Sequence, residues 1–230
     1  MAKYGVIIVA GGSGRRMGGT LPKQFMLLSG EPVVARTINT FAEALPSADI
    51  VVVLPEEHIP LWHNLSARFD IAPHRTVAGG KERFMSVKCG IEALGDDVEY
   101  IAVHDGVRSL VSKRLIISTL LDAEKHGATI PVVEVADSYR MMDDEGEQGA
   151  SHIVERSRLR IVQTPQIFRA DLLRRAYQQP YDASFTDDAS VVESLGERVW
   201  VVEGERTNIK LTTPSDMSFA EWCLTQNNEE

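Results

Sequence analysis

The segment nearest the start of the chain limits the choice of fold most strongly. Tyr4 to Ala10 read YGVIIVA, a near-continuous apolar and β-branched run. Such a run predicts a strand that is buried on both faces, as in a parallel sheet. The turn that follows it contains Gly11, Gly12, Ser13 and Gly14. Glycines directly after a buried strand let backbone N–H groups approach a phosphate closely, so this turn is a candidate anion site.

Strand and helix patterns alternate along the rest of the chain. Further strands are predicted at 50–54, 75–78, 100–103, 128–135, 159–162, 198–202 and 209–211. Helices are predicted from Pro32 to Leu45, at 56–68, 83–94 and 169–178, between the cap residues Ser112 and Gly127, after Thr186, and from Pro214 behind the N-cap Thr213. This alternation predicts a single α/β domain over residues 1–230, with a three-layer, mostly parallel, Rossmann-like sheet.

Residues 136–157 break this rhythm. Their sequence, ADSYRMMDDEGEQGASHIVERS, is polar, acidic and glycine-containing, with little to bury. We interpret it as a β-arm or hairpin that protrudes from the sheet, and a disordered loop is the alternative.

Composition and charge exclude several classes of protein. With 43% hydrophobic and 25% charged residues, the chain is neither disordered nor fibrous. No apolar run approaches the roughly 20 residues of a membrane helix, and the N-terminus does not have the pattern of a signal peptide. Cys89 and Cys223 are expected to be reduced thiols of a cytoplasmic protein. The net charge of −9 argues against nucleic acid as a partner, although a small polyanion can bind where basic residues converge.

Basic residues converge at the first turn. Arg15, Arg16 and Lys23 lie within nine positions and on no single helical face. The turn is not a P-loop, because no Lys-Ser/Thr pair follows its last glycine. It is not the dinucleotide fingerprint either, because Met17 stands where the third glycine belongs. Because that glycine is missing, a dehydrogenase is disfavoured. A triphosphate is the ligand that would neutralise these cations and be oriented by them.

Motifs along nearly the whole chain resemble one enzyme family. They are the loop at 10–18 with Pro22-Lys23-Gln24, then Gly79-Gly80-Lys-Glu-Arg83, Val103-His-Asp-Gly-Val-Arg108, Val154-Glu-Arg156-Ser, Gln163-Thr-Pro-Gln166, Thr186-Asp-Asp-Ala-Ser190 and Asn208-Ile-Lys210. In this order they resemble the 2-C-methyl-D-erythritol 4-phosphate cytidylyltransferases, which belong to the nucleotidyltransferases that activate sugar phosphates. The chain departs from the family's pattern at Gly11, Lys81 and Ser109, and at Ser138 to Arg140.

The resemblance implies a role for each group of residues. The catalytic cations would be Arg16, Lys23, Arg156 and Lys210. The nucleotide would contact Ala10, Gly11, Gly12, Ser13, Gly14, Arg15, Gly79, Gly80, Ser86, Asp105 and Gly106. The acceptor would contact Asp105, Arg108, Ser138, Arg156, Thr164, Thr186 and Lys210. For Thr186 the competing interpretation is a plain helix N-cap, and His104 is expected to be a packing residue beside the site.

The expected reaction is attack by a sugar phosphate on the α-phosphorus of CTP. That phosphate is largely dianionic at neutral pH, so the site needs cations and alignment rather than a general base. Mg²⁺ or another divalent cation is the expected cofactor, held mostly by the CTP phosphates, with Asp105 as the candidate protein ligand. The resemblance also implies a homodimer in which the arm at 136–157 completes the neighbour's site.

Two alternatives remain open at this stage. Val107-Arg108 after Asp105-Gly106 is also similar to ribitol 5-phosphate cytidylyltransferases, so the acceptor could be another polyol phosphate. A catalytically silent nucleotide-binding subunit is the other alternative. Arg16, Lys23, Arg156 and Lys210 argue against it, because a silent subunit needs no cations to stabilise a transition state.

Overall fold

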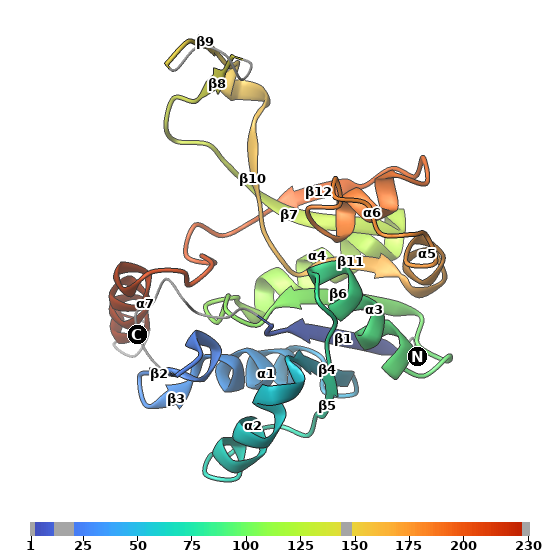
Figure 1. Cartoon of the computed structure of the whole chain (residues 1–230), viewed down its shortest axis with the longest axis vertical. Helices are drawn as coiled ribbons and strands as arrows, with labels where there is room; N and C mark the ends of the chain where they lie inside the picture. The colour runs from blue at the N-terminus through green and yellow to red at the C-terminus, as the bar shows by residue number, and fades with distance from the viewer. Residues whose placement is uncertain (1–2, 12–20, 144–148, 227–230) are drawn as a thin grey trace.

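A central sheet organises the molecule (Figure 1). The computed structural model describes residues 3–11, 21–143 and 149–226. Among these, eight strands form the sheet: β1 (Tyr4–Val9), β4 (Asp49–Leu54), β5 (Arg75–Ala78), β6 (Tyr100–Asp105), β7 (Ala128–Glu134), β10 (Arg160–Val162), β11 (Gln166–Arg169) and β12 (Trp200–Glu203). Their order is β10-β7-β11-β6-β1-β4-β5, with β12 paired to β7. The β1–β4, β1–β6, β4–β5 and β7–β12 pairs are parallel, whereas β10 and β11 run antiparallel to their neighbours.

The two faces of β1 explain the three layers. Alternate side chains of a strand point to opposite faces, and here both faces are buried. Ile7 packs in one core with α3 (Arg83–Ala93), α5 (Ala170–Ala176) and α6 (Asp188–Glu193). Its neighbours Val6 and Ile8 pack in a second core with α1 (Val33–Ala44), α2 (Ile59–Ser66) and α4 (Lys113–His126). The predicted three-layer α/β class is confirmed.

Local signals set the helix ends, with one correction. The Ser112 hydroxyl accepts a hydrogen bond from the Leu115 N–H at 3.0 Å, and α4 stops at Gly127, whose φ is 85°. The helix α7 (Pro214–Gln226) begins at the predicted proline. The N-cap of α6, however, is Asp187 and not Thr186, because the Asp187 carboxylate accepts from the Ser190 N–H at 2.9 Å.

The predicted strand at 209–211 is wrong. This segment runs across the loop after β6, and its backbone makes one bond there, from the Leu211 N–H to the Val107 carbonyl at 2.9 Å. Apolar Ile209 and Leu211 are explained instead by a small core beside α7, which also contains Val107. The segment therefore crosses the end of β6 rather than extending the sheet.

The arm at 136–157 is a hairpin that protrudes from the body (Figure 1). Its strands β8 (Arg140–Met142) and β9 (Ser151–Ile153) pair antiparallel, and the Arg140 guanidinium donates to the Ser151 hydroxyl and carbonyl, each at 2.7 Å. The prediction of an arm is confirmed over a disordered loop. Short elements complete the chain: η2 (Lys23–Phe25), β2 (Leu27–Leu28), β3 (Glu31–Pro32), η3 (Glu56–His58) and η4 (Arg156–Arg158). None of the helices in the described ranges has the length and apolarity to cross a membrane.

Candidate functional site

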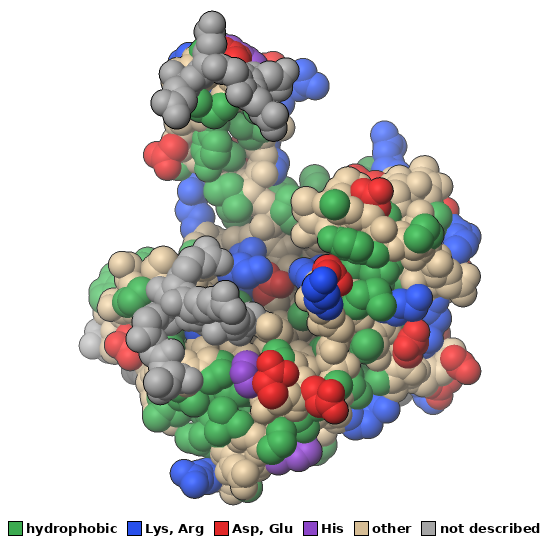
Figure 2. All heavy atoms as spheres, in the orientation of Figure 1, with side chains coloured by type: hydrophobic (Ala, Val, Ile, Leu, Met, Phe, Trp, Pro, Cys, Tyr) green, Lys and Arg blue, Asp and Glu red, His purple; other side chains and the backbone are tan. Residues whose placement is uncertain are grey.

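A pocket of about 270 Å³ opens at the carboxyl ends of β1 and β6. These strands are parallel, with Val9 opposite Asp105, so both deliver their following loops to the same edge of the sheet. α/β proteins bind ligands at this edge. Of the predicted site residues, the pocket lining includes Ala10, Gly11, Lys23, Gly80, Ser86, Asp105 and Lys210. Figure 2 shows basic and acidic side chains side by side in the hollow at the centre of this face.

Gly80 lines the pocket next to Gly79, and neither position has room for a side chain. The Ser86 hydroxyl, in the first turn of α3, lies 3.3 Å from the Gly80 carbonyl and 3.2 Å from the Glu82 carbonyl. A Cβ at Gly79 would lie 2.7 Å from the Ser86 Oγ, and one at Gly80 would lie 2.3 Å from the Met85 Cβ. Glycine at these positions therefore lets the backbone pack directly against α3.

Lys23 lies in the pocket wall and is almost fully buried. Its element, η2, is fixed against the end of β1 by the Gln24 side chain, which donates to the Ala10 carbonyl at 2.8 Å. The charge of Lys23 also affects Asp216, which lies on α7. There, burial alone would raise the pKa of Asp216, but N–H groups of the neighbouring backbone and the Lys23 charge lower it. A buried ammonium is thus held at the wall of the pocket.

Asp105 is the acidic centre of the site. Its Oδ2 lies 3.1 Å from the Lys210 Nζ and 3.3 Å from the Arg108 Nε, and its Oδ1 lies 3.7 Å from the Arg83 Nε. Burial alone would raise the pKa of Asp105, but the charges of Arg83, Lys210 and Arg108 hold it well below its usual range. Asp105 is therefore ionised, and three cations are gathered around one carboxylate.

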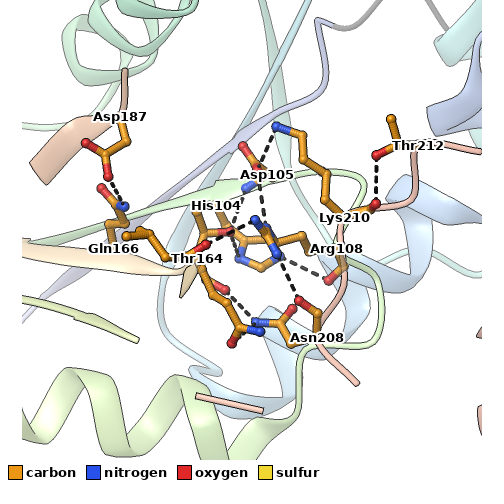
Figure 3. Close-up of polar contacts among 12 residues, drawn as sticks. His104, Asp105, Arg108, Thr164, Gln166, Asp187, Asn208, Lys210 and Thr212 are labelled. Carbon is orange, nitrogen blue, oxygen red and sulfur yellow. Dashed lines mark hydrogen bonds and ion pairs between the residues drawn. The ribbon is translucent and has the colours of Figure 1, made fainter. Parts of the chain in front are cut away.

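The segment that crosses β6 supplies Lys210 and supports Arg108 (Figure 3). The Arg108 guanidinium donates to the Asn208 carbonyl at 2.9 Å. The Asn208 side chain in turn donates to the Thr164 carbonyl at 2.8 Å. The predicted residues Arg108, Thr164 and Lys210 are thus brought together with Asp105, although they come from distant parts of the sequence.

Sequence reasoning missed the role of Arg83. Its guanidinium makes a two-point contact with Asp188, at 2.9 and 2.6 Å, and Asp188 also accepts from the Tyr177 hydroxyl at 2.6 Å. Burial alone would lower the pKa of Arg83, but the charge of Asp188 raises it above its usual value. Burial raises the pKa of Tyr177 well above its usual value, so this hydroxyl stays protonated. The only sequence signal for a role of Arg83 was its place in the motif that begins with Gly79-Gly80.

Several other predicted residues that the structure describes do not line the pocket of their own chain. Ser138 and Arg156 lie exposed on the arm, where the Arg156 guanidinium donates to the Ala136 carbonyl at 2.8 Å. Thr186 is exposed just before α6, and its N–H donates to the Ser190 hydroxyl at 3.0 Å. Gly106 packs close to Ala10, since a Cβ there would lie 3.0 Å from the Ala10 Cβ. The predicted Gly12, Ser13, Gly14, Arg15 and Arg16 lie outside the described residues.

Two acidic residues, Asp105 and Glu82, line the pocket. Within residues 3–11, 21–143 and 149–226, no group of three or more His, Cys, Asp or Glu side chains is placed to hold a metal ion. Asp105 already faces three cations. Mg²⁺ typically takes one or two carboxylates together with phosphates and waters. Among the described residues these carboxylates therefore form no chelating cage.

Comparison with known proteins identifies the family. The sequence model of the 2-C-methyl-D-erythritol 4-phosphate cytidylyltransferase family matches residues 4–226. The chain belongs to this family. Relatives of that name from Bacteroides fragilis and Porphyromonas gingivalis are 45% and 47% identical to it, each across 95% of this chain and 98% and 96% of their own.

Solved structures agree with this family assignment. The 4-diphosphocytidyl-2C-methyl-D-erythritol synthase of Anaerococcus prevotii superposes with a TM-score of 0.82 at 28% identity, covering 97% of this chain and 96% of its own. The 2-C-methyl-D-erythritol 4-phosphate cytidylyltransferase of Thermus thermophilus gives a TM-score of 0.75 at 31% identity, over 98% of this chain and all of its own. Like this cytidylyltransferase family, the chain has a mostly parallel sheet with flanking helices.

Proposed function

We propose that the pocket transfers CMP from CTP to 2-C-methyl-D-erythritol 4-phosphate. An oxygen of the acceptor phosphate attacks the α-phosphorus, and the bond to the β-phosphate breaks, so that its electron pair leaves with pyrophosphate. The observation that carries this proposal is the gathering of Lys210, Arg108 and Arg83 around Asp105, beside buried Lys23, in a chain of net charge −9. Membership of the cytidylyltransferase family gives the nucleotide and the acceptor.

The residues supply alignment and charge rather than proton transfer. One N–H of the Lys210 ammonium donates to Asp105, and its two other N–H groups can donate to an incoming phosphate. Lys23 stabilises negative charge that develops on the triphosphate, together with Arg16 as the family resemblance implies. Gly80 and Ser86 line the pocket and offer the cytosine edge backbone groups and a hydroxyl oxygen that can accept a hydrogen bond.

Mg²⁺ enters this proposal as part of the nucleotide substrate. When bound to the phosphates it neutralises part of their charge. Lys210 and Arg108 already pair with the Asp105 carboxylate, so the phosphates would supply most of the ligands of the ion. The proposal also assigns the reaction to the cytoplasm, where the free thiols of Cys89 and Cys223 stay reduced.

A pyrophosphate-release assay tests the reaction directly. Purified full-length chain, CTP and Mg²⁺ are offered 2-C-methyl-D-erythritol 4-phosphate and ribitol 5-phosphate in parallel. We expect release with the first acceptor and none with CTP alone. ATP in place of CTP is expected to be inactive, because the family to which the chain belongs consists of cytidylyltransferases. Release with ribitol 5-phosphate alone would move the acceptor assignment, and no release with either would favour a silent subunit.

We propose further that two copies of the chain pair through the arm, so that Arg156 and Ser138 serve the neighbour's pocket. The support is the exposed apolar surface of the hairpin: Ile153 is 80% exposed, Met142 61% and Met141 55%. Exposed apolar clusters of this kind mark interaction sites.

The arm proposal predicts the behaviour of one surface variant. Ile153→Glu is expected to shift the protein from dimer to monomer in light scattering and to lower its activity, because the neighbour's site loses Arg156. Leu121→Glu is the matched control, since Leu121 is an apolar residue on α4 that is 52% exposed and lies away from the arm. A wild-type protein that is monomeric and fully active at assay concentration would contradict this proposal.

A further inference from the structure

A closed chain of hydrogen bonds lies behind the carboxylate of Asp105 (Figure 3). The Asp105 N–H donates to the Thr164 Oγ1 at 3.1 Å. The Thr164 Oγ1 lies 3.0 Å from the His104 Nδ1, and the His104 Nε2 lies 3.2 Å from the Arg108 carbonyl oxygen. His104 is fully buried and Thr164 is 5% exposed. This chain of hydrogen bonds therefore starts and ends on backbone groups of one turn, residues 105–108.

The fixed polarity of those backbone groups determines every proton between them. An amide N–H can only donate, so the Thr164 oxygen accepts from Asp105. A carbonyl can only accept, so the His104 Nε2 carries a proton and donates it to Arg108. A neutral imidazole has one proton, so Nδ1 is bare and accepts the hydroxyl proton of Thr164. Neutral His104 is the form that burial favours.

These hydrogen bonds hold both ends of the turn that carries Asp105 and Arg108. The bond to the Asp105 N–H fixes the peptide between His104 and Asp105, and the bond to the Arg108 carbonyl fixes the peptide after Arg108. A further bond, from the Arg108 N–H to the Asp105 carbonyl at 2.9 Å, closes the turn between them. The side chains of Asp105 and Arg108 leave this turn toward each other, 3.3 Å apart.

The same bonds restrict what the Thr164 hydroxyl can do. The hydroxyl donates its proton to the His104 Nδ1, and one of its lone pairs accepts the Asp105 N–H. A phosphate oxygen needs a donor, and this hydroxyl has none left to offer. The exposure of 5% also leaves little of Thr164 within reach of a ligand.

We propose that His104 and Thr164 are positioning residues, which hold the 105–108 turn so that Asp105 lines the pocket and Arg108 pairs with its carboxylate. In this proposal Thr164 acts through Asp105 and not by contact with the acceptor phosphate. His104 is more than a packing residue, although its ring also packs edge-on against Phe41 at 4.9 Å between centroids. The kinetic part of this proposal rests on the function proposed above, whereas the proton assignment does not.

Nitrogen NMR tests the proton assignment without any substrate. Full-length protein labelled with ¹⁵N-histidine is measured at neutral pH, and the His104 signals are identified by their loss in His104→Asn. We expect an unprotonated Nδ1 and a protonated Nε2 for this residue. The opposite tautomer, or a ring protonated on both nitrogens, would overturn the proposal.

Matched variants test the positioning role by kinetics. Thr164→Val keeps the shape but removes the hydroxyl, and Thr164→Ser keeps the hydroxyl. We expect Thr164→Val to lose on the order of 10²-fold in kcat/KM for the acceptor, the effect of a small misplacement in a site, while KM for CTP changes little. Thr164→Ser is expected to retain most of the activity.

The His104 variant separates positioning from direct contact. His104→Phe keeps a ring against Phe41 and removes both nitrogens, so we expect it to reproduce the loss seen in Thr164→Val. If Thr164 contacted the acceptor itself, His104→Phe would leave the acceptor kinetics at wild-type values, which overturns the proposal. A purely structural role would lower the folded, active fraction and leave both KM values unchanged, which overturns it as well. If the wild type uses neither acceptor, the proposed function fails and the NMR result alone decides.

Discussion

Replacing Lys23 with alanine is expected to lower kcat by a factor on the order of 10²–10³, as does the loss of one preorganised charge donor in other enzymes. Lys23 is buried in the pocket wall, on an element fixed to the end of β1 by Gln24. A cation held in place before the reaction starts can stabilise charge that grows on the leaving pyrophosphate without reorganising. KM should change much less than kcat, because the charge grows most in the transition state. Steady-state pyrophosphate release measures both constants.

Two controls separate catalysis from folding in this experiment. Lys23→Met keeps the buried aliphatic stem, so its urea-unfolding midpoint shows how much stability depends on packing alone. Lys125→Ala removes an exposed lysine from the last turn of α4 and is expected to leave kcat unchanged. Wild-type turnover in a folded Lys23→Ala protein would remove Lys23 from the reaction.

The fold was predictable because its signals are local. Tyr4 to Val9 is apolar on both faces, and the strand-helix alternation after it admits few architectures. The one wrong strand, at 209–211, shows the limit of this reasoning. Ile209 and Leu211 are apolar because they enter a small core beside α7, and nothing in their own sequence reveals that partner.

Site residues that line the pocket themselves were predictable from sequence motifs. Residues whose role depends on a contact with another side chain or backbone group were harder to predict. Asp105 and Lys210 came from motifs, and the structure brings them to 3.1 Å. Arg83 was overlooked, because its importance depends on Asp188, which lies 105 positions further along the chain. Likewise, the hydroxyl of Thr164 has a meaning only when the neighbouring backbone of Asp105 is known. Such pairings are properties of the tertiary structure.

The second large effect is expected on stability, from Asp188→Asn. Asp188 is fully buried and joins α6 to Arg83 on α3 and to Tyr177 beside α5. Removing one charge of a buried pair leaves the other uncompensated, which typically costs about 3–5 kcal/mol. The Arg83 side chain is 29% exposed and its Nε still lies 3.7 Å from Asp105, so water and this carboxylate relieve part of the cost, and we expect about 3 kcal/mol. Urea denaturation of the wild type and the variant measures the difference in the free energy of unfolding.

A surface pair in the same region provides the matched control for Asp188→Asn. Arg175 and Glu197 form an ion pair with both side chains about half exposed, so Glu197→Gln is expected to cost at most about 1 kcal/mol. The double variant Arg83→Met with Asp188→Leu removes both charges and should lose less stability than the two single variants added together, because neither charge is left unpaired. Its activity should nevertheless stay low, since Asp105 then lacks one of its three cations. A cost for Asp188→Asn no larger than that for Glu197→Gln would show that the buried pair adds nothing beyond a surface contact.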